Sequence, residues 1–230
     1  MDILYLLFIA TFIFTLVVQF KVSSTFNKYA SGSAGVGRTG AEVARRILDA
    51  HGLFHVRIER VHGNLTDHYD PRSQVLRLSD AVYDRSSASA VGVAAHEVGH
   101  AIQHAQNYAP IVWRSKLVPA VNFASRFSWI AIVLGTLFIY SAPALGYYLT
   151  GAGVVLFAAT TLFHLVTLPC ELNASKRALT ELELCGWYNS NELAASKKVL
   201  SAAAMTYVAA LAMSFIQLLR LMRIFVNRRD

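Results

Sequence analysis

Three long stretches without a charged side chain constrain this chain more than any other feature of its sequence. They are Ile3–Phe20, Phe127–Leu168 and Val199–Leu219, of 18, 42 and 21 residues. A helix needs about 20 apolar residues to cross the hydrocarbon core of a bilayer, and 55% of all residues are hydrophobic against 15% charged. We therefore expect a mainly α membrane protein. The composition excludes a disordered, collagenous or disulfide-stapled secreted chain.

The three stretches predict about four transmembrane helices. Residues 1–20 are interpreted as a retained anchor rather than a signal peptide, because no basic residue precedes the apolar run. Residues 127–168 are too long for one crossing and contain Pro143 in a turn-like sequence, which predicts a hairpin of two helices. In the C-terminal part, 199–230, the apolar residues either cross the membrane or lie along its interface, and crossing is favoured.

The positive charge of the chain, +7 in all, gathers beside the apolar stretches. Between Lys21 and Arg126 there are 13 basic and 8 acidic side chains, whereas the N-terminal end has no basic side chain. The positive-inside rule therefore predicts that 21–126 and 169–198 face the cytoplasm. The basic tail with Arg220, Arg223, Arg228 and Arg229 does not fit this layout. No basic run with interleaved aromatic residues occurs, so a nucleic-acid partner is not expected.

The water-facing segment 21–126 predicts a small α+β arrangement. Ser31–Gly37 has the composition of a flexible linker, and Thr39 and Glu42 form a capping box for a helix over 40–51. Leu53–Val61 and Val75–Ser79 alternate like strands and predict a short antiparallel ribbon. Either of two serines, Ser86 or Ser87, then caps a helix that continues to about residue 106.

Residues 96–100 of that last helix read His-Glu-Val-Gly-His. Positions i and i+4 of a helix share one face, so His96 and His100 can bind one metal ion while Glu97 reaches a water beside it. The pattern arises by chance in about one chain in a hundred. A metal site is therefore favoured over two structural histidines that hydrogen-bond to carbonyl groups.

A catalytic zinc ion needs a third protein ligand and one open position. In metzincins a glycine and a third histidine follow the two histidines of the motif. The corresponding positions in this chain are Gln103 and Gln106, so the third ligand is not found there. His104 lies about 12 Å of helix rise from His96, too far to share the ion, and is expected in the core or beside the ligands.

Glu171 is the first acidic residue after Glu97 and follows the predicted hairpin directly, so it is the candidate third ligand. The alternative is an acid favoured by the dipole at a helix N-terminus. The later acids Glu181, Glu183 and Glu192 are expected to be solvated. The two cysteines, Cys170 and Cys185, are expected to be free thiols.

The chain resembles the YugP-like family of neutral zinc metallopeptidases of membranes over nearly its whole length, and is more remotely similar to HtpX-like membrane gluzincins. The segments that carry the resemblance are Thr39-Gly-Ala-Glu-Val-Ala44, His68-Tyr-Asp-Pro71, Leu78-Ser79, Ala95-His-Glu-Val-Gly-His-Ala-Ile-Gln-His104 and Thr167-Leu-Pro-Cys-Glu-Leu-Asn-Ala-Ser175.

The resemblance implies a zincin-like α+β catalytic portion attached to the transmembrane helices of a bacterial-type plasma membrane protein. It also implies one catalytic Zn²⁺ held by His96, His100 and Glu171, with Glu97 as the catalytic base. The sequence departs from the resemblance at two positions where an aspartate is expected, Asn173 and Ser175. Either side chain could still accept a hydrogen bond from an imidazole N–H.

These expectations together describe a membrane-bound zinc endopeptidase. Its substrates would be membrane proteins or membrane-associated peptides, because Glu171 lies close to the end of an apolar stretch. Val75–Ser79 is the candidate edge strand for an extended substrate. The candidate donors to the oxyanion are His68, Tyr69, His104 and Arg177. His164, inside an apolar stretch, is either functional or a bonding residue between helices.

Three other functions are less well supported. A membrane di-iron oxygenase would need further histidine boxes, and Gly52 separates His51 from His55. An intramembrane protease would carry its metal on a membrane span, whereas polar residues flank 96–100. A non-catalytic membrane scaffold would not need Glu97 between two intact histidines.

Overall fold

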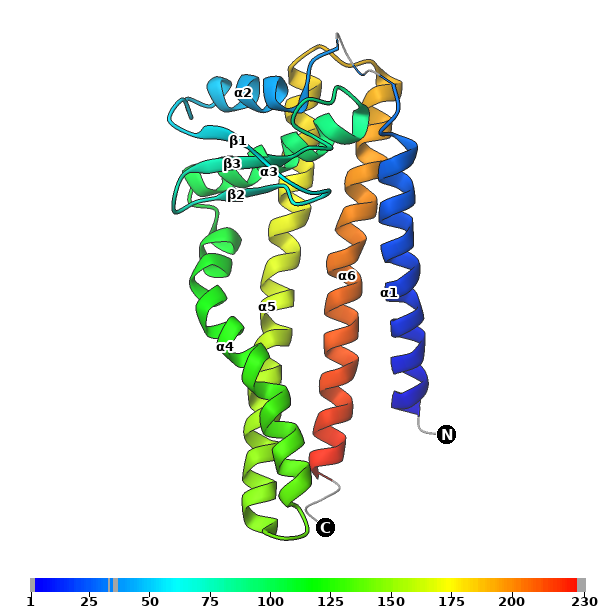
Figure 1. Ribbon diagram of the computed structural model, residues 1–230, viewed down its shortest axis with the longest axis vertical. Helices are drawn as coiled ribbons and strands as arrows, with labels where there is room; N and C mark the ends of the chain where they lie inside the picture. Colours follow the sequence, from blue (N-terminus) through cyan, green and yellow to red (C-terminus); the bar gives the residue numbers. More distant parts are fainter. Residues whose placement is uncertain (1–2, 33, 35–36, 227–230) are drawn as a thin grey trace. The chain divides into compact units, whose positions relative to one another are not determined.

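The computed structural model describes residues 3–32, 34 and 37–226. Part of the predicted linker, and Arg228 and Arg229 of the basic tail, lie outside these residues. The described part confirms a mainly α membrane protein with a small α+β portion (Figure 1). Its elements in chain order are α1 (Ile3–Lys28), α2 (Gly40–Ala50), β1 (Arg57–Val61), β2 (His68–Asp70), β3 (Val75–Ser79), α3 (Ala88–Ala105), α4 (Ala109–Phe138), α5 (Pro143–Leu184) and α6 (Ser190–Val226).

The chain divides into two compact units. The helical unit consists of residues 1–17, 113–168 and 206–230, and the sheet unit consists of residues 18–112 and 169–205. Helices α1, α4, α5 and α6 supply the helical unit, while the sheet unit holds all three described strands together with α2 and α3.

Four described helices, α1, α4, α5 and α6, are long and apolar enough to cross a membrane. The predicted hairpin is present as α4 and α5, with its turn at residues 139–142. Both helices extend beyond the apolar stretch 127–168, because α4 begins at Ala109 and α5 ends at Leu184. Helix α5 continues past Pro169 to Leu184, and this polar end belongs to the sheet unit. Ala178 and Leu182 of this end are buried in the core of that unit.

Within the helical unit, the α4–α5 hairpin depends on glycines at its contact. A Cβ built on Gly153 would lie 2.6 Å from Cγ1 of Ile132 and 2.8 Å from the carbonyl oxygen of Ser128. A Cβ on Gly146 would lie 2.8 Å from the carbonyl oxygen of Gly135. These glycines let the two backbones approach closely, which is how helices commonly associate in a membrane.

Contacts within the helical unit place the end of α6 beside the start of α1. The Thr11 hydroxyl lies 3.7 Å from the Met213 sulfur, and the Arg220 guanidinium lies 4.1 Å from the centre of the Phe8 ring. By length and composition, α6 is long and apolar enough to cross a membrane. The stacking of Arg220 on an aromatic ring accommodates a basic residue at this end of the helix.

The strands of the sheet unit have the order β1-β3-β2. Strand β2 pairs antiparallel with β3, whereas β1 pairs parallel with β3. The predicted antiparallel ribbon between β1 and β3 is therefore wrong. The physical reason is that β2 lies between β1 and β3 in the sequence. The chain goes from β1 at one edge of the sheet to β2 at the other edge and then returns to β3 in the centre. Apolar residues from β3 are buried on both of its faces, as expected of a central strand.

The helices of the sheet unit begin where their caps predict. Thr39 and Glu42 form the capping box of α2, and Ser87, rather than Ser86, caps α3. Helix α2 packs on α3 and, with β3 and the polar end of α5, surrounds one apolar core. Core residues include Val43, Ile47, Leu48, Leu76, Leu78, Ala94, Val98, Ile102, Ala178 and Leu182.

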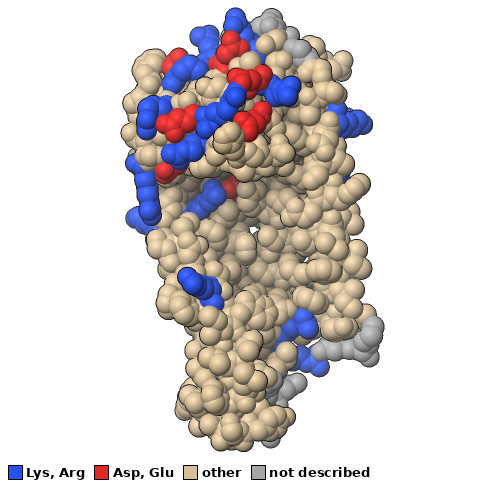
Figure 2. Space-filling model, viewed as in Figure 1, with Lys and Arg blue, Asp and Glu red and all other residues tan. Residues whose placement is uncertain are grey.

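Charged side chains mark the surface of the sheet unit. Figure 2 shows Lys and Arg mixed with Asp and Glu over this unit, and few charges over the helical unit. On the sheet, Arg77 lies 3.5 Å from both Glu59 and Asp70, and Arg57 lies 3.1 Å from Glu59. Both of these arginines therefore have a negative neighbour, as on an ordinary solvated face.

Candidate metal centre

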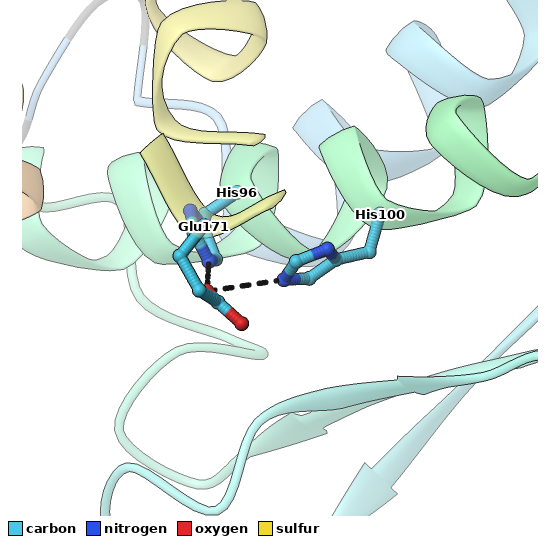
Figure 3. A group of neighbouring side chains, drawn as sticks. All are labelled: His96, His100 and Glu171. Carbon is cyan, nitrogen blue, oxygen red and sulfur yellow. Dashed lines mark hydrogen bonds and ion pairs between the residues drawn. The ribbon is translucent and has the colours of Figure 1, made fainter. Parts of the chain in front are cut away.

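Three predicted ligands meet within the sheet unit. His96 and His100 project from one face of α3, one turn apart, and Glu171 projects toward them from α5 (Figure 3). One carboxylate oxygen of Glu171 lies 3.2 Å from Nε2 of His96 and 3.4 Å from Nε2 of His100. One ligand atom from each residue lies within 4.8 Å of the other two.

The chemistry and burial of these donors fit a zinc ion. Two imidazole nitrogens and one carboxylate oxygen form a ligand set that catalytic zinc sites use, with a further position left for water or substrate. Glu171 is 1% exposed and His100 is 7% exposed. A carboxylate so deeply buried needs a compensating cation or hydrogen bonds, and either a bound metal ion or a protonated imidazole would supply the cation.

The electrostatics of the site favour positive charge at His100. Burial lowers the pKa of His100, but its hydrogen bonds with Cys170 and Glu171 and the nearby Glu97 carboxylate together raise that pKa to about 10. The same carboxylates would favour a bound cation in this position, because opposite charges attract strongly where water is largely excluded.

Glu97, the predicted base, is half-buried beside the sheet. One of its carboxylate oxygens accepts a hydrogen bond of 3.2 Å from the backbone N–H of Tyr69 in β2. Burial raises the pKa of Glu97, although the neighbouring His96 and His100 oppose that rise. The contact orients the Glu97 carboxylate toward the edge strand.

Ser175 is the partner of the His96 imidazole, the first candidate ligand. Its hydroxyl oxygen lies 3.1 Å from Nδ1 of His96. With the proton on Nδ1 and the hydroxyl as acceptor, the Nε2 lone pair of His96 is left for a metal ion. The alternative partner, Asn173, does not contact an imidazole in the structure.

Gln103 is the partner of the second imidazole, and sequence reasoning did not identify it. Its side-chain oxygen lies 3.0 Å from Nδ1 of His100, three residues earlier on α3. The i, i+3 spacing of His100 and Gln103 is the signal that could have revealed it, because these positions are neighbours on a helix. Asn173 contacts Gln103 instead of a histidine.

The candidate oxyanion donors differ in their surroundings. Tyr69 and His104 place their ring centres 5.7 Å apart, so His104 lies beside Tyr69 rather than in the core. Arg177 donates through Nε to Asn173, at 2.7 Å. His68 is exposed and its Nδ1 lies 2.8 Å from the carbonyl oxygen of Thr66, which is a local turn contact.

Several other predicted residues lie away from this cluster. His51 lies 2.9 Å from Glu181, so the prediction that Glu181 is simply solvated is wrong. Helix α2 ends at Ala50, which leaves His51 and His55 without a shared helix. Cys170 and Cys185 are free thiols, as predicted. His164 belongs to the helical unit.

Two histidines one turn apart, the glutamate between them and a carboxylate from a second helix define the class of zinc-peptidase-like sites. Comparison with known proteins agrees with this class. Residues 4–226 match the family described as "Putative neutral zinc metallopeptidase", and the chain belongs to that family.

A curated relative covers most of the chain. The protein named "Putative membrane protease YugP" of Bacillus subtilis (strain 168) is 50% identical over 212 residues, which is 92% of each chain. These matches confirm the predicted family. No solved structure matches the chain.

Proposed function

We propose that this protein is a membrane-bound zinc endopeptidase that hydrolyses peptide bonds close to the membrane surface. The observation that carries the proposal is the convergence of His96, His100 and Glu171 on one point, with the Glu97 carboxylate beside them. Three ligands and a general base are the protein groups that zinc-dependent hydrolysis requires.

In this proposal His96, His100 and Glu171 hold the ion, and Glu97 handles the proton. Bound zinc supplies Lewis-acid chemistry that polarises a peptide carbonyl and activates water. Glu97 accepts the proton of the attacking water, whose oxygen bonds to the carbonyl carbon. Glu97 then delivers that proton to the amine nitrogen as the C–N bond breaks.

The strand that would hold a substrate is β2 rather than β3. Val75–Ser79 was the predicted edge strand, but β3 lies between β1 and β2 and both of its edges are paired. Among the described strands, β1 and β2 are both at an edge, and β2 is the one that contacts the proposed base: the N–H of its residue Tyr69 donates to Glu97. An extended peptide added to that edge would lie beside the proposed base.

Cleavage near the membrane surface is supported by the position of Glu171 in the chain. Only Pro169 and Cys170 separate it from the apolar stretch that ends at Leu168. Substrates with a transmembrane segment and a scissile bond at graded distances from it would test this. We expect cleavage to fall as that distance grows, and cleavage independent of distance would contradict it.

A cytoplasmic position of the sheet unit is part of the proposal and is supported by the excess of basic residues between Lys21 and Arg126. A cysteine introduced at the exposed Leu65 tests it. In intact cells an impermeant maleimide should leave that cysteine unlabelled. Labelling of intact cells would show that the sheet unit lies on the outer side of the membrane.

Metal analysis of the full-length protein in detergent tests the zinc site. Wild type should contain one zinc ion per chain, and Glu171→Ala should lose most of it because one of three ligands is gone. Glu183→Ala is the matched control, since Glu183 is an exposed acid of the same helix. Stoichiometric zinc in Glu171→Ala would show that Glu171 is not the third ligand. Wild type that binds zinc without cleaving any peptide would favour a membrane scaffold.

A further inference from the structure

We infer that Gln103 is a positioning residue that sets the tautomer and ring orientation of His100 and links His100 to the helix that carries Glu171. The inference rests on the proposed function, because His100 is a zinc ligand only in that proposal. It adds a residue that neither the sequence motif nor the family description assigns.

The first step is the contact between Gln103 and His100. Gln103 is 0% exposed, and its Oε1 lies 3.0 Å from Nδ1 of His100. An amide oxygen only accepts, so this contact requires the proton on Nδ1. In the neutral ring, which is the form that binds a metal ion, Nε2 of His100 is then the nitrogen with a free lone pair, and it is the one that faces Glu171.

The second step concerns the other end of the Gln103 side chain. Its Nε2 donates to the carbonyl oxygen of Cys170 at 2.8 Å and to Oδ1 of Asn173 at 2.9 Å. Both acceptors belong to α5 and flank Glu171 in the sequence. One buried amide therefore ties the His100 ring of α3 to the segment of α5 that presents the third ligand.

The third step shows why the amide of Gln103 cannot turn over. A reversed amide would point NH₂ at His100 and a carbonyl oxygen at two other oxygens. Asn173 cannot relieve that conflict by turning as well, because its Oδ1 also accepts a 2.7 Å hydrogen bond from Nε of Arg177. The Cys170 thiol adds a donor to Oε1 of Gln103, at 3.4 Å. The surroundings thus specify one orientation.

Glutamine is suited to this position because it accepts at one end and donates at the other. Methionine has a similar shape, but it cannot donate and its sulfur accepts only weakly. Glutamate keeps the acceptor for His100 but presents its second oxygen to Cys170 and Asn173, which are acceptors. The two substitutions therefore separate the orientation of His100 from the connection to α5.

The test uses the full-length protein in detergent and measures zinc affinity by competition with a chelator. Gln103→Met should weaken zinc binding about 10- to 100-fold, the usual effect of losing a hydrogen-bond partner of a metal ligand. Gln103→Glu should weaken it less, because the acceptor for His100 remains. The visible spectrum of the Co²⁺-substituted protein should change in Gln103→Met and stay close to wild type in Gln103→Glu.

Ile102→Val controls for loss of stability alone. Ile102 is the buried neighbour on α3, and trimming it costs about 0.5–1.5 kcal/mol of folding free energy without touching a ligand. This variant should keep wild-type zinc affinity and the wild-type Co²⁺ spectrum. A parallel loss of affinity in Ile102→Val would show that Gln103 acts through stability only.

The outcomes separate this inference from the proposed function. If wild type binds no zinc, the zinc site itself fails. If wild type binds zinc and Gln103→Met binds it equally well, only the inference fails. If Gln103→Met does not fold, the result for Gln103→Glu decides. A smaller loss of zinc affinity in that variant supports the inference. A loss of 100-fold or more contradicts it, because the acceptor for His100 is still present.

Discussion

The carbonyl oxygen of Ala174 lies 2.8 Å from the point where a Cβ on Gly99 would be, and the Ala174 Cα lies 3.3 Å from it. Gly99 belongs to α3 and lies between His96 and His100, while Ala174 lies three residues after Glu171 on α5. The absent side chain lets the two helix backbones approach closely, and this approach brings the carboxylate within reach of both imidazoles.

Substitution of Gly99 should therefore damage the proposed zinc site. In Gly99→Ala the added methyl group meets backbone, which cannot rotate away, so we expect a loss of about 1–3 kcal/mol of folding free energy together with weaker zinc binding. Gly92→Ala is the control on the same helix, because its Cβ would meet the Ser196 side chain of α6 at 3.3 Å rather than the backbone of α5. Thermal unfolding and zinc titration of both variants provide the measurement. Equal zinc affinity in Gly99→Ala and wild type would contradict the argument.

Glu97→Gln should separate zinc binding from catalysis. The amide has nearly the same shape as the carboxylate but cannot take a proton from water, so cleavage should fall about 10²- to 10⁴-fold while zinc content stays at the wild-type value. Peptide cleavage and metal analysis on the same preparation provide the two readings. Undiminished cleavage would exclude Glu97 as the base.

Ser175→Ala should weaken zinc binding by removing the acceptor for Nδ1–H of His96. The expected loss is about 10- to 100-fold in affinity. Ser175→Thr keeps a hydroxyl group and should recover part of that affinity. If alanine and threonine behave alike, the hydroxyl does not orient the imidazole.

Tyr69→Pro tests the role of the edge strand. Proline removes the backbone N–H that Glu97 accepts, and an edge strand tolerates proline where that N–H points out of the ladder. Cleavage should fall in Tyr69→Pro by more than in Tyr69→Ala, which loses only the ring, while zinc affinity stays unchanged in both. A larger loss in the alanine variant would assign the effect to the ring.

Protonation of Asp70 should lower the stability of the fold at acid pH. A hydrogen bond from the Ser73 hydroxyl, followed by one from the Arg72 N–H, lowers the pKa of Asp70 from 3.8 to about 2. The ionised form therefore stabilises the fold above about pH 4, and this contribution is lost as the pH falls toward 2. The melting temperature of Asp70→Asn should lie below that of wild type at pH 5 and approach it near pH 2. A constant difference would contradict the assignment.

Much of the site could be predicted because it depends on local periodicity. The i, i+4 spacing of His96 and His100 on one helix face follows from helix geometry alone. Glu171 could be found by elimination, since no acidic residue lies between it and Glu97. The partners of the two imidazoles could not be ranked in this way, because Ser175 and Asn173 are both on α5 and only the rotation of that helix against α3 selects Ser175 for His96.

The sequence by itself determined which segments are apolar enough to cross a membrane, where α2 and α3 begin, and which histidines can share an ion. These properties depend on neighbours within a few residues, where hydropathy, capping and helical spacing act directly. Only the tertiary structure decided that β3 lies between β1 and β2, that β2 faces Glu97, and that Gln103 joins His100 to α5. Each of these results from packing between segments far apart in the chain, and the local pattern of residues carries no information about which distant surface it will meet.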